Sequence, residues 1–336
     1  MLLALGMLLL TSCRGDKKPK ATGTSSQTRA PSAAPASKFI VSPPCPARSI
    51  RGLMYAGFSE RQKLDLYLPL PSTKGRRPLV IWVHGGGWAG GSRVSVERWA
   101  LRQVCRGYAV ASVGYRFSWE APFRAQLVDL KNAVRYLKMY AWKYRLDPYR
   151  FAVWGASAGG HLAALVATTG HFPDANLTEL DRFSARVSAV IDWWGPSDLG
   201  AMPRRWPRYC KSHRDPTAPD SAESRLLGCP LRQCPDAARA ASPITYVHSR
   251  VPPFLLMAGE RDCTVPARQS LILRDALAKK GVEVEYVMVK GAGHGDGRWS
   301  QRDVERRVDT FLDRHLGRHT RYFARPRAKK KSKESS

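Results

Sequence analysis

Short apolar segments alternate with longer amphipathic segments along most of this 336-residue chain. The helical spacing is clear at 122–143, where Leu127, Leu130, Val134 and Leu137 recur three or four positions apart. Strands that alternate with helices form a mostly parallel sheet with helices on both faces, so the sequence predicts an α/β fold. The expected strands are 63–69, 79–83, 108–114, 150–154, 187–193, 253–258 and 283–289; the expected helices are 92–106, 122–143, 157–169, 266–280 and 299–316; an irregular insert is expected at 196–250.

The strongest local signal is the segment 155–159, Gly-Ala-Ser-Ala-Gly, which follows the apolar run 151–154 and opens an Ala- and Leu-rich helix. This layout predicts a sharp turn between a strand and a helix, with Ser157 at its apex. A serine hydroxyl is a poor nucleophile until a base takes its proton, and such a turn exposes the hydroxyl to a base on another loop. The small neighbours suit a strained turn that tolerates little bulk. A G-x-S-x-G match alone is weak evidence, so its context decides.

A glycine-rich segment upstream supplies part of that context. The strand 79–83 leads into His-Gly-Gly-Gly-Trp at 84–88. Glycines let backbone N–H groups turn toward a ligand, and each such donor stabilises the oxyanion of acyl transfer by about 3–4 kcal/mol. We expect Gly86, Gly87 and Ala158 to supply these donors. The glycines also fit a phosphate-binding pattern, but no acidic residue for a ribose ends the next strand and no Gly-Lys-Ser/Thr marks a P-loop.

Two later loops carry the partners that a nucleophilic serine needs. The strand 253–258 leads to Asp262, and the strand 283–289 leads to His294. The chain order is therefore serine, acid, histidine, each on a loop after a strand. Each residue alone has an ordinary explanation, because an Asp after a strand often caps a helix and a loop histidine is usually solvated. Asp192 is a rival for the acid, but it follows the wrong strand for the usual order.

These motifs together resemble the α/β-hydrolase superfamily. The HGGGW loop and the GxSAGG turn are similar to those of bifunctional dicarboxylate/feruloyl-esterase-like and hormone-sensitive-lipase-like esterases. The stretches at 107–116, 192–198 and 241–244 look closer to the feruloyl-esterase-like branch. The resemblance covers roughly residues 48–316, which we expect to form a single catalytic domain.

The resemblance implies an α/β-hydrolase fold and a triad of Ser157, Asp262 and His294. It also implies hydrolysis of carboxylic esters, of the short acyl or feruloyl type, without a cofactor. Two alternatives stay open: an amide-cleaving relative, such as a peptidase or an arylformamidase, and a non-catalytic binding module on the same scaffold. Binding modules of this kind usually lack a triad member, so the complete set favours an enzyme that acts on a small ester.

Other residues near the expected site have structural explanations as well as functional ones. Trp88 and Trp194 are candidates for an acyl or aromatic pocket, although tryptophans at strand ends more often belong to the core. We expect His84 to brace the glycine-rich loop. His161 is expected to pack, or to form a hydrogen bond within its helix. No CxxC pair or Cys/His cluster is present, so we expect no metal site.

The N-terminal segment differs in kind from the rest. Residues 1–10 are almost wholly apolar and lead to Leu-Thr-Ser-Cys at 10–13, which resembles the lipobox of bacterial lipoproteins. In that family the cysteine is lipidated, so Cys13 is expected to anchor the protein to a membrane of the cell envelope, with 14–47 as a flexible tether. The alternative is an ordinary cleaved signal peptide and a secreted protein, although no Lys or Arg precedes Arg14. About ten apolar residues are too few to span a bilayer.

Export would place the other six cysteines in an oxidising compartment, where they can form up to three disulfides. Cys210, Cys229 and Cys234 lie in the expected insert, and Cys263 adjoins the proposed triad acid. A bridge from the insert to Cys263 would hold the insert over the site. Cys105 lies on an apolar helix face, so we expect it to be a free, buried thiol.

The net charge of +28 invites comparison with nucleic-acid-binding proteins. Residues 14–49 contribute +6 and residues 317–336 contribute +7, which leaves +15 for the segment between them. Nearly half of the excess therefore lies in the tether and in a basic tail that we expect to be disordered. Basic tails can attach to anionic membranes or polysaccharides. No nucleic-acid-binding motif is present, so we interpret the charge as a solvated, arginine-rich surface without a nucleic-acid partner.

Overall fold

The structure is a computed structural model that describes residues 42–70, 75–172, 179–203, 205–211 and 214–317. The predictions for the signal peptide, Cys13, most of the tether and the basic tail fall outside these described residues. Within them, no helix combines the length and the apolar character that crossing a bilayer requires.

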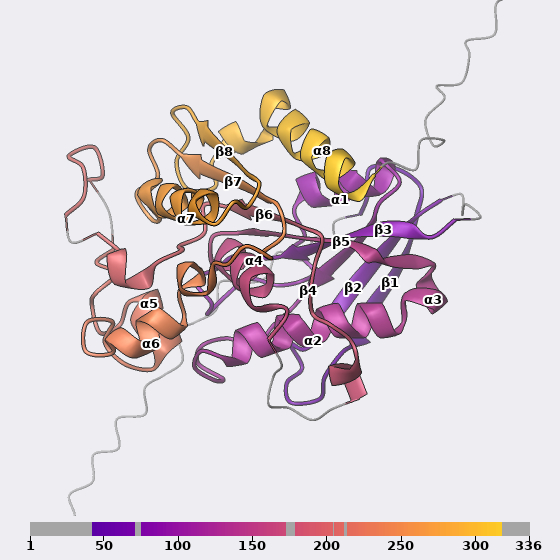
Figure 1. The fold of residues 1–336 in the computed structure, drawn as a ribbon, viewed down its shortest axis with the longest axis horizontal. Helices are drawn as coiled ribbons and strands as arrows, with labels where there is room; N and C mark the ends of the chain where they lie inside the picture. Colours follow the sequence, from indigo (N-terminus) through magenta and orange to yellow (C-terminus); the bar gives the residue numbers. More distant parts are fainter. Residues whose placement is uncertain (1–41, 71–74, 173–178, 204, 212–213, 318–336) are drawn as a thin grey trace, which may run out of the picture. The chain divides into compact units, whose positions relative to one another are not determined.

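An eight-stranded sheet forms the centre of the described part of the chain (Figure 1). Its strand order is β1-β2-β4-β3-β5-β6-β7-β8. Pairing is antiparallel between β1 and β2 and between β2 and β4, and it is parallel from β4 to β8. The strands are β1 (Ala47–Met54), β2 (Lys63–Pro69), β3 (Arg77–Val83), β4 (Ala109–Val113), β5 (Leu146–Ala156), β6 (Ala189–Trp193), β7 (Phe254–Gly259) and β8 (Val284–Val289). This mostly parallel sheet confirms the predicted α/β-hydrolase fold.

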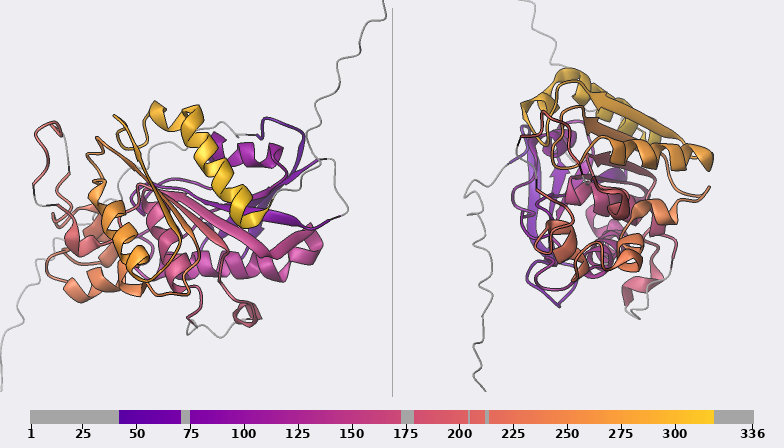
Figure 2. Two further views of the ribbon diagram at one scale, coloured as in Figure 1. Left: turned by 45° about the horizontal axis from the view of Figure 1, so that its top comes forward. Right: turned by 90° about the vertical axis from the view of Figure 1, so that its left-hand side faces the viewer.

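Helices cover both faces of the sheet, as Figures 1 and 2 show. The helices α1 (Arg98–Cys105) and α8 (Arg302–Leu316) pack on one face, and α2 (Ala125–Met139), α4 (Ala158–Thr169) and α7 (Arg268–Lys279) pack on the other. Side chains along a strand alternate between the two faces, so one strand serves both cores. In β3, Ile81 belongs to the core beneath α2 and α4, whereas Trp82 belongs to the core beneath α1 and α8.

Several elements differ from their predicted bounds. The strand β1 was not expected, because it is a half-exposed edge strand with two arginines. The helix α1 begins at Arg98 rather than at 92, and the predicted helix 122–143 divides into α2 and α3 (Ala141–Tyr144). The insert contains short helices rather than only irregular chain. These are η2 (Leu199–Ala201), α5 (Ala222–Leu227), α6 (Pro235–Ala240) and η3 (Pro243–Tyr246); η1 (Glu179–Arg182) and η4 (Gly297–Ser300) lie outside the insert.

Disulfides join three pairs of cysteines in the described residues: Cys45 with Cys105, Cys210 with Cys263, and Cys229 with Cys234. The expected bridge from the insert to Cys263 is therefore confirmed. The expectation of a free thiol at Cys105 is wrong. Cys105 is the last residue of α1 and is half-buried, and it meets a partner 60 residues earlier in the chain. Helical periodicity carries no information about such a partner.

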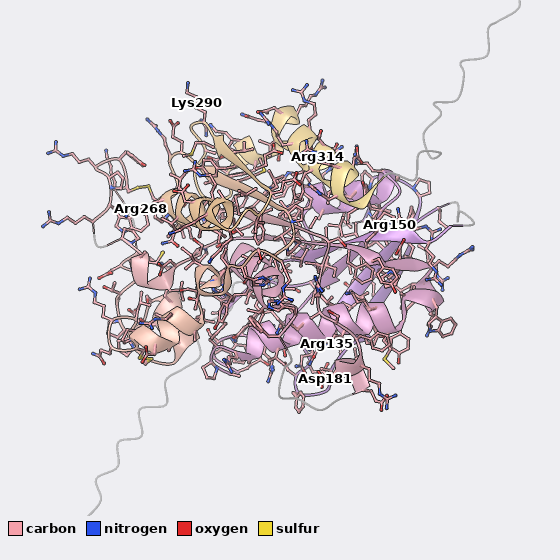
Figure 3. The ribbon with its side chains drawn as sticks, viewed as in Figure 1. Arg135, Arg150, Asp181, Arg268, Lys290 and Arg314 are labelled. Carbon is pink, nitrogen blue, oxygen red and sulfur yellow. A yellow bond between two sulfur atoms is a disulfide. The ribbon has the colours of Figure 1, made fainter. Side chains whose placement is uncertain are left out.

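Ion pairs connect helices that are distant in the sequence. Arg106, the residue after α1, lies 2.8 Å from Asp313 of α8, and Arg135 of α2 lies 3.6 Å from Asp181 of η1. Figure 3 shows Arg135 and Asp181 on the side of the sheet opposite Arg314, which belongs to α8. Because the pair of Arg106 and Asp313 is partly solvated, it stabilises the fold by only about 0–1 kcal/mol.

Candidate active site

Ser157, Asp262 and His294 meet beyond the carboxyl ends of the parallel strands. Ser157 lies between β5 and α4, Asp262 follows β7, and His294 follows β8. The Nε2 atom of His294 lies 2.9 Å from Ser157 Oγ, and its Nδ1 atom lies 2.7 Å from Asp262 Oδ2. An Nδ1–H that donates to the carboxylate leaves Nε2 able to accept the serine proton. The three predicted residues thus form one hydrogen-bonded chain.

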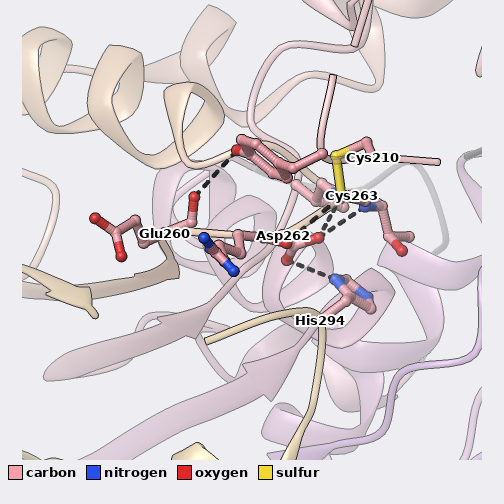
Figure 4. Close-up of a disulfide and its surroundings, with 9 residues drawn as sticks. Cys210, Glu260, Asp262, Cys263 and His294 are labelled. Carbon is pink, nitrogen blue, oxygen red and sulfur yellow. Dashed lines mark hydrogen bonds and ion pairs between the residues drawn. A yellow bond between two sulfur atoms is a disulfide. The ribbon is translucent and has the colours of Figure 1, made fainter. Parts of the chain in front are cut away.

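The Asp262 side chain is fixed by backbone donors. It is 3% exposed, and its Oδ1 atom accepts hydrogen bonds from the N–H groups of Thr264 and Val265 at 2.8 and 2.9 Å. The other carboxylate oxygen is thereby directed at His294. Figure 4 shows this contact beside the Cys210–Cys263 disulfide, which links the insert to the same loop.

The turn at Ser157 has the strained backbone that the sequence predicts. Its φ is 56° and its ψ is −125°, a conformation that few non-glycine residues adopt. A Cβ atom at Gly155 would overlap the carbonyl oxygen of Gly159, and a Cβ atom at Gly159 would overlap that of Val83. The turn therefore requires glycine at both positions. The N–H of Ser157 donates to the Trp193 carbonyl at 2.8 Å, which fixes the apex against β6.

The glycine-rich loop faces the serine. Gly86, Gly87 and Ala158 line the same cavity as Ser157. Gly86 has a φ of 111°, and its carbonyl oxygen accepts the N–H of Gly90 at 3.0 Å, so the loop closes on itself. Ala158 is the first residue of α4, where a backbone N–H has no acceptor within the helix. These three residues remain our candidates for an oxyanion-binding site.

His84 braces the loop from below, as expected. Its ring stacks on Tyr115 with 4.5 Å between the ring centres, and its Nδ1 atom lies 2.8 Å from the carbonyl oxygen of Gly85. The Tyr115 hydroxyl donates to the carbonyl oxygen of His84 at 3.0 Å. Burial lowers the pKa of His84 to about 4, so the ring is neutral and acts as a support.

His161 connects the glycine-rich loop to the insert, which differs from the prediction of packing or a bond within its helix. The indole N–H of Trp88 donates to His161 Nδ1 at 3.1 Å, and His161 Nε2 donates to the Ala241 carbonyl at 2.6 Å. Burial lowers the pKa of His161 to about 4, so the neutral ring accepts at one nitrogen and donates at the other. Its partners are 73 and 80 residues away, and the local sequence does not reveal them.

A cavity of about 850 Å³ opens at Ser157 and His294. This volume is within the range of small-molecule sites. Trp88 and Trp194 both line the cavity, although they are only 2% and 4% exposed, and their part in an acyl or aromatic pocket stays a prediction. The insert adds residues that the sequence did not single out. They are Arg214, Pro216, Ser221, Ala222, Glu223 and Arg225.

Asp192, the rival for the triad acid, lies elsewhere. It is fully buried, and its Oδ1 atom accepts the N–H of Gly195 at 2.9 Å. Burial raises the pKa of Asp192 to about 7. The carboxylate beside His294 is that of Asp262. Among the described residues, no group of three or more His, Cys, Asp or Glu side chains is arranged to hold a metal.

A mostly parallel sheet, a serine on a strand–turn–helix apex, and an acid and a histidine after two later strands define an α/β-hydrolase. Within this class, the chain belongs to the BD-FAE family, whose sequence profile matches residues 64–277.

Named esterases are among the similar proteins. Esterase LipC of Mycobacterium tuberculosis is 30% identical over 248 residues, which are 73% of this chain and 59% of LipC. The chain spans a little over half the length of such curated relatives. A truncated carbohydrate esterase from gut microbiota superposes with a TM-score of 0.71 at 28% identity, over 80% of this chain and 96% of that one. The bifunctional GH43-CE protein of Bacteroides eggerthii superposes with a TM-score of 0.70 at 30% identity, over 80% of this chain and 35% of that one.

Proposed function

We propose that this protein is a serine hydrolase that cleaves carboxylic esters through an acyl-enzyme. The observation that carries the proposal is the hydrogen-bonded chain from Asp262 through His294 to Ser157 beside an open cavity. Membership of the BD-FAE family and similarity to named esterases support it.

The reaction uses only groups of this chain and water. His294 Nε2 takes the proton of Ser157 as Oγ attacks the ester carbonyl, and Asp262 stabilises the imidazolium that forms. The N–H groups of Gly86, Gly87 and Ala158 bind the oxyanion. The imidazolium then protonates the departing alcohol, and a water molecule activated by His294 releases the acid and restores the serine.

The proposed substrates are short acyl or feruloyl-type esters of carbohydrates. One of the similar solved structures is described as a carbohydrate esterase, and the cavity is large enough for a sugar ring beside a short acyl group. The stretches at 107–116, 192–198 and 241–244, which resemble the feruloyl-esterase-like branch, support the acyl part of the proposal.

We further propose that the protein is exported and held in the cell envelope through Cys13. The three disulfides support an oxidising compartment.

Replacement of the nucleophile tests the reaction. Ser157→Ala should lower kcat for p-nitrophenyl acetate by at least about 10⁴-fold, because no group remains to form the acyl-enzyme. Circular dichroism should show an unchanged fold. Full turnover by purified Ser157→Ala would refute the proposal.

The two buried aspartates provide a matched comparison. Asp262→Asn should lower kcat by about 10⁴-fold, because the amide stabilises the wrong tautomer of His294. Asp192→Asn should keep most of the turnover, because its side chain contacts Gly195 and not His294. If Asp192→Asn lowered kcat more than Asp262→Asn, the acid of the triad would be Asp192.

A further inference from the structure

The insert places an acidic side chain, that of Glu223, against the cavity that contains Ser157 and His294. Glu223 lies in the first turn of α5 and is only 9% exposed. In the described part of the chain, no Lys, Arg or His nitrogen lies within ion-pair distance of its carboxyl group, and the one hydrogen-bond donor to it is its own backbone N–H. Within the described residues, the site therefore contains a nearly buried carboxyl group that no other side chain contacts by an ion pair or a hydrogen bond, and Arg225 acts on it only at longer range.

Folding alone does not account for this carboxyl group. Burial raises the pKa of Glu223 above its usual value, which means that the charged form is destabilised there. The N-terminus of α5 does not need the glutamate as a cap, because Ser221 Oγ already accepts the N–H of Ser224 at 3.0 Å. A nearly buried acid whose one hydrogen-bond donor is its own N–H destabilises a fold, so its position at the cavity points to a ligand that completes its hydrogen bonds.

The segment that carries Glu223 is firmly held. Ser224 Oγ donates to the Ala218 carbonyl at 2.7 Å and accepts the N–H of Leu231 at 3.0 Å. The N–H of Phe123 donates to the Leu226 carbonyl at 2.7 Å, which connects α5 to the segment before α2. The Cys229–Cys234 disulfide closes the turn that follows. The backbone that carries Glu223 is therefore fixed beside the cavity, which suits a recognition group.

The other charged residues of the cavity indicate which ligand fits. Arg214 and Arg225 line it together with Glu223 and Glu97, so two guanidinium groups accompany two carboxyl groups. This balance gives no net negative potential that would attract a cation. It provides hydrogen-bond donors beside acceptors, which suits a neutral molecule with several hydroxyl groups. The two oxygens of one carboxylate can accept from neighbouring hydroxyls, and charge strengthens these bonds.

We propose that Glu223 determines specificity for the alcohol part of the substrate by accepting hydrogen bonds from free hydroxyl groups of a sugar whose ester is cleaved at Ser157. This inference rests on the proposed ester hydrolysis and adds the residue that recognises the sugar. Glu223 takes no part in proton transfer.

Three acetyl esters separate sugar recognition from ester cleavage. They are a methyl glucoside with one acetyl group, the same compound with its remaining hydroxyls methylated, and p-nitrophenyl acetate. Glu223→Ala should lower kcat/KM for the first by about 10- to 100-fold, the effect of losing a hydrogen bond to a charged group. The other two esters should change by less than about threefold. Glu223→Gln should show a smaller loss on the first ester, because its amide oxygen still accepts.

The neighbouring helix of the insert supplies a matched control. Asp236 lies in the first turn of α6, its side chain is 94% exposed, and it does not line the cavity. Asp236→Asn should leave all three rates unchanged. Thermal unfolding adds a second measurement: Glu223→Gln should have an equal or higher Tm, because it removes a buried charge, whereas loss of a structural contact would lower Tm.

The outcomes distinguish sugar recognition by Glu223 from the ester hydrolysis on which it rests. If the wild type cleaves p-nitrophenyl acetate but Glu223→Ala slows all three esters equally, ester hydrolysis stands and sugar recognition by Glu223 is refuted. The same holds if the methylated and free glucosides respond alike. If the wild type cleaves none of the esters, both proposals fail. A selective loss on the free glucoside alone supports the inference.

Discussion

Backbone strain in this protein is concentrated at single residues around the cavity. Four non-glycine residues in the described ranges have a positive φ, and three of them, Trp88, Ser157 and Trp194, line the cavity. Such conformations cost about 1–3 kcal/mol each and persist only where the surroundings hold them. Here the supports are visible: Trp88 donates to His161, and the N–H of Trp194 donates to the Met257 carbonyl.

The burial of Asp192 should make the stability of the protein depend on pH. The pKa of Asp192 is raised to about 7 in the folded protein, against about 3.9 in an unfolded chain. Between these values the folded state binds the proton and the unfolded state releases it, so the free energy of unfolding falls as pH rises from about 4 to about 7. Asp192→Asn does not ionise and still offers an acceptor to Gly195. This substitution should therefore remove the loss of unfolding free energy that ionisation of Asp192 causes, which amounts to up to about 4 kcal/mol.

The measurement is thermal unfolding of both proteins at pH 5 and pH 8. The advantage of Asp192→Asn over the wild type should be larger at pH 8. Parallel pH profiles for the two proteins would show that Asp192 ionises normally.

At the scale of elements, the link between the insert and the β7 loop has a testable role. The Cys210–Cys263 disulfide joins residues 53 positions apart, next to Asp262. A disulfide that closes a loop of this length stabilises the fold by about 4 kcal/mol, if its effect is to restrict the unfolded chain. Mild reductant should therefore loosen the insert over Ser157 before the sheet unfolds. We expect an altered kcat or substrate range at temperatures where circular dichroism is unchanged.

A second bridge serves as the comparison. Cys45→Ser with Cys105→Ser removes a disulfide of similar span outside the insert, so it should lower Tm without changing the order of preferred substrates. Thiol counting under denaturing, non-reducing conditions gives an independent check. Six free thiols besides that of Cys13 would mean that no bridge forms.

The elements also show how far the sequence could predict this structure. Strands buried on both faces have continuous apolar sequences, so their positions were predicted, and Ser157 and Asp262 were found because each follows such a strand. His294 follows β8, an edge strand that was predicted from its alternating pattern instead. The edge strand β1 lacks a continuous apolar sequence, since it contains the exposed Arg48 and Arg51, and the guanidinium group of Arg51 contacts Asp65 of β2. The partner of Cys105, the bonds of His161 and the burial of Glu223 could not be predicted, because each depends on residues far away in the chain.

For the whole molecule, the proposed anchor leads to a prediction about location. The full-length protein should fractionate with membranes, and Cys13→Ala should release or misprocess it, because lipidation requires the thiol. Ser12→Ala keeps a small residue before the cysteine and should leave the protein anchored. Mass spectrometry of the mature N-terminus provides the check, and an unmodified N-terminus beyond residue 13 would argue against lipidation.

The division of labour between the sheet and the insert has an evolutionary consequence. The reacting side chains come from loops that directly follow β5, β7 and β8, whereas one part of the cavity wall comes from the segment between β6 and β7. Mutations in that segment can remodel which alcohol is accepted while the chemical step is inherited unchanged. The disulfide between Cys210 and Cys263 keeps the insert attached to the loop after β7 while its sequence changes. Proteins that evolve from this one would therefore change the alcohol that they accept before they change the reaction.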